Sequence, residues 1–343
     1  MNPQVLLNRV GQEQAKGYCT HPEASQTTCS GKPTAAHTIQ KEGGLRAIAE
    51  NGHVMSIKRA SLDLIKNEGS LVPGKDGIGR TSTFPGFCNA HDGMFAAAEG
   101  AVVPLDDRTA FLLSYRSVAY ERLMKEAALR ANEANRRDGD LGKPFEDQAR
   151  IQTALHGEKL QIEASLRDIA SIQARFNAVF KDPSLSGFSY LIVEFDRVLP
   201  VVSSGALFPE VDMFGDRLQS LDSWKALDAL AVNFTVLNGR SVLVLGWLTG
   251  TKAPEAFAAS FARLPDDDKA NTSARFAMEW IENTYATPTW WTGLPVEVKR
   301  TALASARTLD APPVCQRDSG GYCSDGIQLV AAAVVRVVGP RAC

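Results

Sequence analysis

The residues with the clearest chemical use lie in the first hundred positions of the chain. Nine residues separate Cys19 from Cys29, and after a long insertion Cys88 and His91 follow as Cys-x-x-His. A Cys and a His three apart at a loop-to-helix junction can both reach one metal ion, and two ligand pairs complete a tetrahedral zinc site. We therefore predict one structural Zn²⁺ bound by these four side chains.

Two other interpretations of this group stay open. In the first, the thiols and the imidazole are ordinary buried side chains. In the second, His21, which lies inside the Cys19 to Cys29 loop, replaces one cysteine as a ligand. Cys315 and Cys323 flank a short polar segment, but they lack the two further nearby ligands that a second metal site needs.

Two further residues indicate that this segment has a catalytic role as well as a structural one. His37 lies in AAHTI, a short apolar stretch that predicts a strand, so backbone pairing would fix its imidazole. Asp92 follows His91 and opens the next helix, where a carboxylate is electrostatically favoured and can face a second ion. Metal-assisted hydrolysis of a phosphodiester needs a histidine that removes a proton from water and a divalent ion that stabilises the leaving oxygen.

The order of these residues resembles a known family. A Cys pair, an apolar strand with His, an insertion and a Cys-x-x-His that opens a helix are similar to the zinc-knuckle branch of the HNH, or ββα-metal, endonucleases. The resemblance implies His37 as general base and Asp92 as the ligand of a catalytic Mg²⁺ or Mn²⁺. His91 stands where the family usually has Cys, and Asp92 where it has Asn or His. The same stretch also resembles the start of a group of uncharacterised bacterial proteins.

The segment that carries these residues has little core of its own. Residues 18–100 are rich in Gly, Ser, Thr and Pro, and helices are expected only at 44–50 and 91–99. Small domains of this kind usually depend on a metal or a disulfide for stability. We expect residues 1–107 to form a small ββα-like module stapled by zinc.

The next segment is helical. Helices are predicted at 108–137 and 145–180, and DGDLGKP interrupts the pattern between them. Their apolar stripes predict a long antiparallel helical hairpin over residues 108–182. Such a hairpin serves as a spacer, or as an arm that binds a protein partner or forms a homodimer.

The last segment, residues 183–343, is predicted to be an α+β domain with a mainly antiparallel sheet, because its strands and helices come in separate runs. Asn238-Gly239 predicts a hairpin turn between two of its strands. The expected strands are 188–202, 231–237, 239–248 and 327–338, and the expected helices are 253–264, 267–285 and 295–306. The sequence gives no role for this domain.

Composition limits the function classes. The chain has 343 residues and a net charge of −2, so it carries no overall positive field and any contact with nucleic acid must be local. No apolar run approaches the roughly 20 residues of a membrane span, and the N-terminus lacks the pattern of a secretory signal. We therefore expect a cytoplasmic protein with no membrane segment, in which cysteines favour metal over disulfides.

Two functions follow as hypotheses. The first is a metal-dependent nuclease of HNH-like type, which hydrolyses phosphodiester bonds of nucleic acid with His37 as general base. The alternative is a non-catalytic zinc-binding protein for recognition or sensing. His37 and Asp92 beside a zinc scaffold favour the enzyme, and the near-neutral charge favours the alternative. The sequence does not decide between them.

Overall fold

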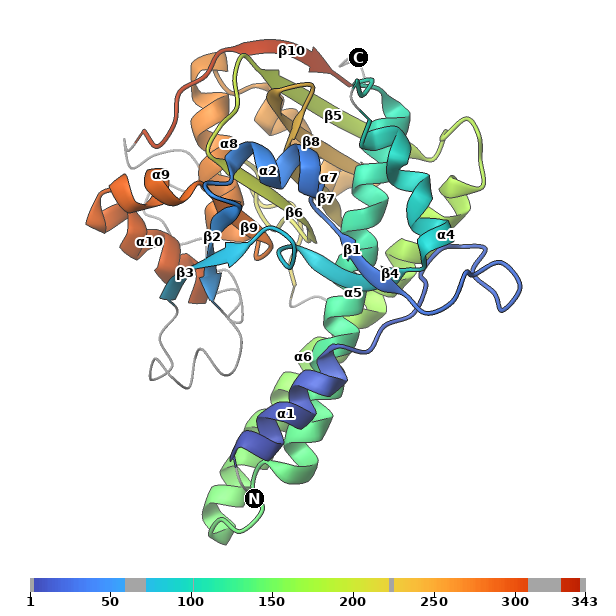
Figure 1. Ribbon diagram of the computed structural model, residues 1–343, viewed down its shortest axis with the longest axis vertical. Coiled ribbons are helices and arrows are strands. Elements are labelled where there is room, and N and C mark those ends of the chain that lie inside the picture. The colour runs from blue at the N-terminus through green and yellow to red at the C-terminus, as the bar shows by residue number, and fades with distance from the viewer. Residues whose placement is uncertain (1–2, 59–71, 101, 222–224, 308–327, 340–343) are drawn as a thin grey trace.

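The computed structural model describes residues 3–58, 72–100, 102–221, 225–307 and 328–339. This part of the chain is α+β, as predicted, with a long helical hairpin and an eight-stranded antiparallel sheet in the order β10-β5-β8-β7-β6-β9-β2-β3 (Figure 1). The strands are β2 (His53–Lys58), β3 (Val72–Gly77), β5 (Phe188–Phe195), β6 (Val201–Leu207), β7 (Leu230–Leu237), β8 (Arg240–Leu248), β9 (Thr284–Ala286) and β10 (Val334–Val338).

The centre of the sheet contains the predicted hairpin. β7 and β8 pair from Ala231 with Gly246 to Leu237 with Arg240. Between them, Asn238 and the following glycine have φ angles of 51° and 76°, so both lie in the left-handed region. Asn-Gly adopts these angles easily in a type I′ turn. The turn predicted from this dipeptide is confirmed.

The single strand predicted over 188–202 is wrong. The extended chain stops at Phe195, and an irregular segment, 196–200, leads to β6. β5 pairs with β8 and β10, whereas β6 pairs with β7 and β9, so the two runs lie on opposite sides of the central hairpin. Pro200 marks the break, because it has no N–H to donate to a ladder.

The two long helices form an arm that projects from the body of the molecule (Figure 1). α5 (Asp107–Asp138) and α6 (Phe145–Phe180) pair as predicted, and α1 (Pro3–Gln14) packs beside α5. Asp106 begins α5 as its N-cap by accepting the backbone N–H of Thr109 at 2.9 Å. The first half of α5 is buried and packs on the sheet, so this helix belongs to both the arm and the body.

Helices cover both faces of the sheet. α5 packs on the face that includes Ala231, whereas Val232 and Phe234 point to the opposite face, as the alternation of a strand requires. That opposite face is covered by α7 (Lys252–Ala262), α8 (Asp266–Trp280) and α9 (Pro288–Gly293), and α10 (Val296–Arg307) packs beside α8.

The N-terminal segment contributes to two sheets. β1 (Thr34–His37) pairs with β4 (Thr83–Phe87) in a separate two-stranded sheet, and the short helix α4 (Asn89–Asp92) follows β4 directly. A 3₁₀ helix, η2 (Gly93–Ala98), continues from α4. Between β1 and β2 lie a π-helical turn, η1 (Lys41–Leu45), and α2 (Arg46–Ile48). β2 and β3 instead extend the main sheet beyond β9, so strands from segments 1–107 and 183–343 share one sheet.

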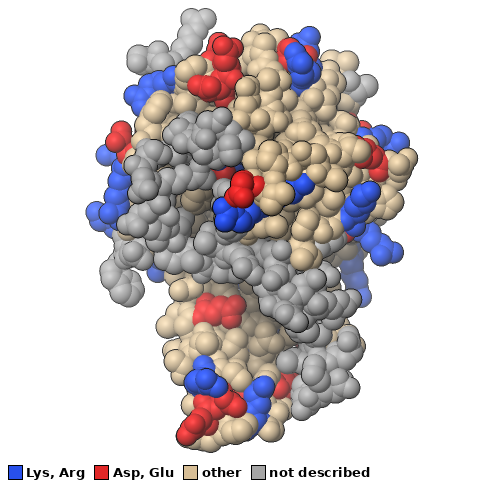
Figure 2. All heavy atoms as spheres, turned by 90° about the vertical axis from the view of Figure 1, so that its left-hand side faces the viewer, with Lys and Arg blue, Asp and Glu red and all other residues tan. Residues whose placement is uncertain are grey.

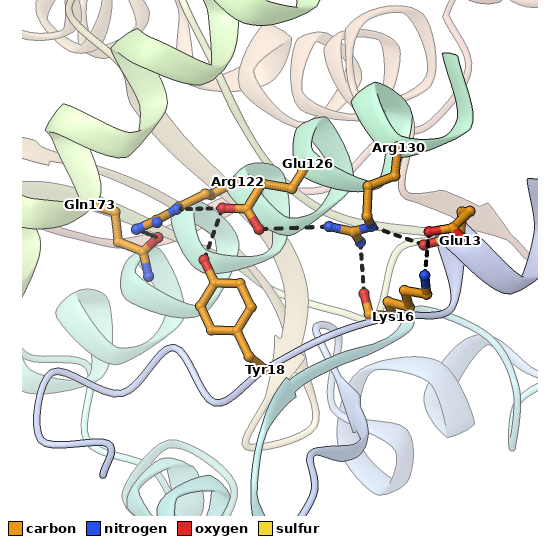
Figure 3. Close-up of polar contacts among 7 residues, drawn as sticks. All are labelled: Glu13, Lys16, Tyr18, Arg122, Glu126, Arg130 and Gln173. Carbon is orange, nitrogen blue, oxygen red and sulfur yellow. Dashed lines mark hydrogen bonds and ion pairs between the residues drawn. The ribbon is translucent and has the colours of Figure 1, made fainter. Parts of the chain in front are cut away.

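A polar network connects α1 and the following loop to the arm (Figure 3). Arg130 of α5 donates to the backbone oxygen of Lys16 at 2.7 Å, just beyond the end of α1. One turn earlier, Glu126 accepts from the Tyr18 hydroxyl at 2.8 Å. Because Tyr18 precedes Cys19, these bonds fix the point at which the chain leaves the arm and enters the cysteine loop.

Phe176 tests how tightly the hairpin is packed. This side chain of α6 is 1% exposed, and its ring centroid lies 5.9 Å from that of Phe111 and 6.0 Å from that of Phe188. Phe176→Ala leaves a cavity and should lower the free energy of unfolding by about 3–5 kcal/mol in urea titrations. Leu160→Ala, at an exposed position of the same helix, should change it by about 0.5 kcal/mol or less. Equal stability of the two variants would contradict this packing.

Candidate metal centre

The four predicted zinc ligands converge on one point. Their sulfur and ring-nitrogen atoms all lie within 4.8 Å of one another. His91 Nδ1 is 3.3 Å from the Sγ atoms of both Cys19 and Cys88. Its distance to Cys29 Sγ is 3.7 Å. A tetrahedral zinc with bonds of about 2.3 Å to sulfur and 2.0 Å to nitrogen places such ligands about 3.5 Å apart. The group can hold one metal ion, and its size and ligand types fit structural zinc.

Two hydrogen-bonded segments deliver these ligands. Cys88 keeps an extended backbone, with φ −79° and ψ 162°, directly after β4, and the single turn of α4 brings His91 back beside it. The cysteine loop is bonded to β4 through Thr20, whose N–H and hydroxyl both donate to Gly86 O at 2.8 and 2.9 Å. The loop with one ligand pair is therefore held against the strand that leads to the other pair.

Hydrogen bonds prepare one thiol for metal binding. Burial raises the pKa of Cys88, but the backbone N–H groups of His91 and Ser30, the Ser30 hydroxyl and the Cys19 thiol bring it down to about 6. Burial and the neighbouring thiols raise the pKa of Cys19 to about 11. The two directions are linked, because the thiol that ionises first keeps the proton on its neighbour. Since a metal binds thiolates, metal binding must release the proton of Cys19.

Side chains of the two arm helices contact the cysteine loop beside the metal centre. The Tyr115 hydroxyl of α5 lies 3.1 Å from Thr20 O in the cysteine loop. His21 stacks on the ring of His91, with centroids 4.0 Å apart, and meets Phe180 of α6 edge to face at 5.0 Å. His21 is not part of the ligand group, so its ring orients His91 and does not replace a cysteine.

His37 ends β1, where it pairs with Thr83 of β4. Its Nε2 atom lies 3.1 Å from the carbonyl oxygen of Ile78. A carbonyl oxygen only accepts, so in the neutral ring Nε2 carries the proton and Nδ1 keeps its lone pair. Within the described ranges no hydrogen bond engages Nδ1. The imidazole is therefore fixed in orientation, with one basic nitrogen available.

Asp92 ends α4 and lies beside an ionic cluster. Burial raises the pKa of its carboxyl; the charges of Arg116 and His37 lower it, and that of Glu99 raises it further. Arg116, Glu99 and His37 thus all lie within electrostatic reach of Asp92. The Asp92 Oδ1 atom is buried and accepts no hydrogen bond from the described residues. These side chains are less tightly gathered than the zinc ligands, since the described chain has no second group of three ligand atoms.

Arg116 was missed by the sequence reasoning. Its side chain is 3% exposed, its Nη1 atom donates to Glu99 Oε1 at 2.6 Å, and its guanidinium lies 3.8 Å from the centroid of the Phe95 ring. The only signal in the sequence is a single charge inside the otherwise apolar and small-residue run AFLLSYRSVA. That run identifies a buried arginine, but its partner depends on how η2 packs against α5.

Among the described residues, no other histidine or cysteine belongs to the ligand group. His53 is exposed at the start of β2, and its Nδ1 atom faces the backbone oxygen of Asn51 at 2.8 Å. Cys315 and Cys323 lie outside the described residues. Glu194 of β5 is buried and forms an ion pair with Arg240 at 3.3 Å.

Comparisons with known proteins give no family. No protein-family model, no curated protein and no solved structure matches this chain. Among the described helices, none combines the length and the apolar character that crossing a bilayer demands. Arguments about function therefore depend on the residues of the site itself.

Zinc content tests the centre. Protein purified without added zinc should contain one zinc per chain, as measured by inductively coupled plasma mass spectrometry. The Cys88→Ser variant should lose this zinc, because three ligands hold the ion far less tightly than four. His21→Ala is the matched control: it removes a ring that stacks on His91 without removing a ligand, and it should keep one zinc. A folded wild-type protein without metal would refute the centre.

Proposed function

We propose that the protein is a metal-dependent nuclease of HNH-like type with His37 as general base. The main support is the free lone pair of His37 Nδ1, in a ring held by Ile78 O and within electrostatic reach of Asp92. A general base needs such a nitrogen in a fixed position. The order β1, β4, α4 also agrees with the ββα unit that the sequence resembles.

Each residue has a separate task in this proposal. Nδ1 of His37 takes the proton of a water molecule that attacks phosphorus. Asp92 binds a divalent ion, Mg²⁺ or Mn²⁺, which supplies stabilisation of the charge on the phosphate and on the leaving oxygen. The buried Oδ1 atom of Asp92 fits this task, because an acceptor without a donor is costly unless something binds it.

The zinc group has a structural task. Four protein ligands close a tetrahedral site and leave no position for a substrate or a reactive water. Cys88 and His91 stand at the start of α4 and within it, so their bonds to one ion hold this four-residue helix in place. Asp92 is thereby positioned relative to His37.

The charge distribution limits how nucleic acid would bind. Figure 2 shows Lys and Arg interspersed with Asp and Glu on one face, without a broad basic field among the residues drawn in colour. The net charge of −2 also gives the chain no overall positive field, so non-specific binding through counterion release contributes little and affinity must come from groups at the site. The same balance favours the second candidate, a non-catalytic zinc-binding protein for recognition or sensing. Both candidates place the protein in the reducing cytoplasm, which keeps the free thiols of Cys19, Cys29 and Cys88 available for metal.

His37→Ala separates the two candidates. Loss of a general base should lower cleavage of nucleic acid by about 10²–10⁴-fold. Zinc content and melting temperature should stay unchanged, because His37 is not a zinc ligand. The assay uses single- and double-stranded DNA and RNA with Mg²⁺ or Mn²⁺, and EDTA as the metal-free condition.

His53→Ala is the matched control for this assay. His53 is an exposed histidine of the same N-terminal segment, and its variant should cleave as fast as the wild type. Equal cleavage by His37→Ala and the wild type would exclude His37 as the base. A zinc-loaded wild type that cleaves none of the four substrates would favour the non-catalytic candidate.

A further inference from the structure

The three thiols of the metal centre differ in their access to solvent. Cys19 and Cys29 are partly exposed, whereas Cys88 is completely buried. The rate at which an oxidant attacks a cysteine depends on its exposure and on its thiolate character, and a bound metal keeps its sulfur ligands in the thiolate form. A small oxidant such as hydrogen peroxide therefore reaches Cys19 and Cys29 before Cys88.

The two exposed sulfur atoms also lie near one another. All the ligand atoms of the centre lie within 4.8 Å of one another, and these include Cys19 Sγ and Cys29 Sγ. A disulfide joins two sulfur atoms at about 2.0 Å, so the two need to approach by at most about 3 Å. A movement of this size is confined to the cysteine loop.

The loop between the two cysteines is free to make this movement. Thr20 anchors one end to β4, and Ser30 anchors the other end by accepting the N–H of Ala90 at 3.0 Å. Within the part of the chain that the structure describes, every hydrogen bond of residues 22–28 ends on another residue of 21–29. The loop can therefore close on itself while both anchors stay in place.

We propose that the metal centre is a redox switch, in which hydrogen peroxide converts Cys19 and Cys29 into a disulfide and the zinc ion is released. One thiolate attacks an oxygen atom of the peroxide, which forms a sulfenic acid and releases hydroxide. The second thiolate attacks the sulfur of the sulfenic acid, which forms the disulfide and releases a second hydroxide. The two sulfur atoms lose two electrons in total, and these electrons reduce one peroxide to two hydroxide ions.

Loss of two thiolates removes half of the ligands. Only Cys88 and His91 then remain, and two ligands do not complete a tetrahedral zinc site. Because both residues stand at the start of α4 or within it, release of the ion also frees the helix that carries Asp92. The switch would thus control the proposed nuclease through α4, but the reaction of the thiols needs only the metal centre.

Zinc release from the full-length, zinc-loaded protein tests this. The test protein carries Cys315→Ser, Cys323→Ser and Cys343→Ser, so the three thiols of the centre are the ones that remain of the six in the chain. On addition of hydrogen peroxide, the absorbance of 4-(2-pyridylazo)resorcinol should report one zinc released per chain. Mass spectrometry of peptides prepared without reduction should find Cys19 joined to Cys29, with Cys88 still a thiol. Dithiothreitol and zinc should restore the loaded protein.

Cys29→His separates disulfide formation from general oxidation of the centre. Histidine keeps a fourth zinc ligand but cannot form a disulfide, so this variant should bind zinc and release it about tenfold or more slowly in peroxide. Cys88→His is the matched control, because it keeps the exposed pair and should release zinc as fast as the test protein. If either variant fails to bind zinc, the zinc release and the disulfide map of the test protein still decide.

The proposal fails if the zinc ion stays bound in peroxide, or if the main disulfide contains Cys88. These outcomes differ from a failure of the nuclease. A protein that cleaves no nucleic acid but releases zinc with the Cys19 to Cys29 disulfide refutes the nuclease and leaves the switch standing. A protein that cleaves nucleic acid and keeps its zinc in peroxide refutes the switch and leaves the nuclease standing.

Discussion

The convergence of three thiols and one imidazole on one point is the constraint that organises the N-terminal part of the chain. The two ligand pairs come from segments far apart in the sequence, and the two-stranded sheet between them has only a short ladder with an irregular register. Thr20 bonds the cysteine loop to β4, and Phe84 and Phe87 of β4 are buried against α5, so packing also holds these segments together. Structural zinc, which contributes about 10–16 kcal/mol in small zinc-binding peptides, would join them further. A metal ion bound by the four side chains would therefore add strongly to the order at this end of the molecule.

The side chains of Asp92, His37 and Arg116 depend on this convergence of ligands in different degrees. α4 has four residues, too few for a helix to be stable by itself. A metal ion bound to His91 would therefore help to position Asp92. His37 depends instead on β1 and on Ile78 O, and Arg116 depends on the packing of α5 against the body. Three separate parts of the fold thus meet at one cluster, which explains why it is looser than the metal centre.

Sequence patterns predicted the parts of the structure that local chemistry determines. Helical periodicity gave both arm helices almost to the residue, and Asn238-Gly239 gave the central turn. The ligand group followed from the spacing of Cys and His. Patterns did not predict that β2 and β3 join the C-terminal sheet, because their pairing with β9 joins residues that lie far apart along the chain. For the same reason the sequence did not reveal Arg116 as a partner of Glu99.

X-ray absorption at the zinc K-edge of the full-length protein tests the central claim most directly. The ligand geometry predicts a zinc coordinated by three sulfur atoms at about 2.3 Å and one nitrogen atom at about 2.0 Å. The Cys88→Ser variant, if any zinc remains, should show one sulfur fewer. A first shell made only of oxygen and nitrogen atoms, or a spectrum with a water in place of one protein ligand in the wild type, would contradict a closed structural centre formed by these four residues.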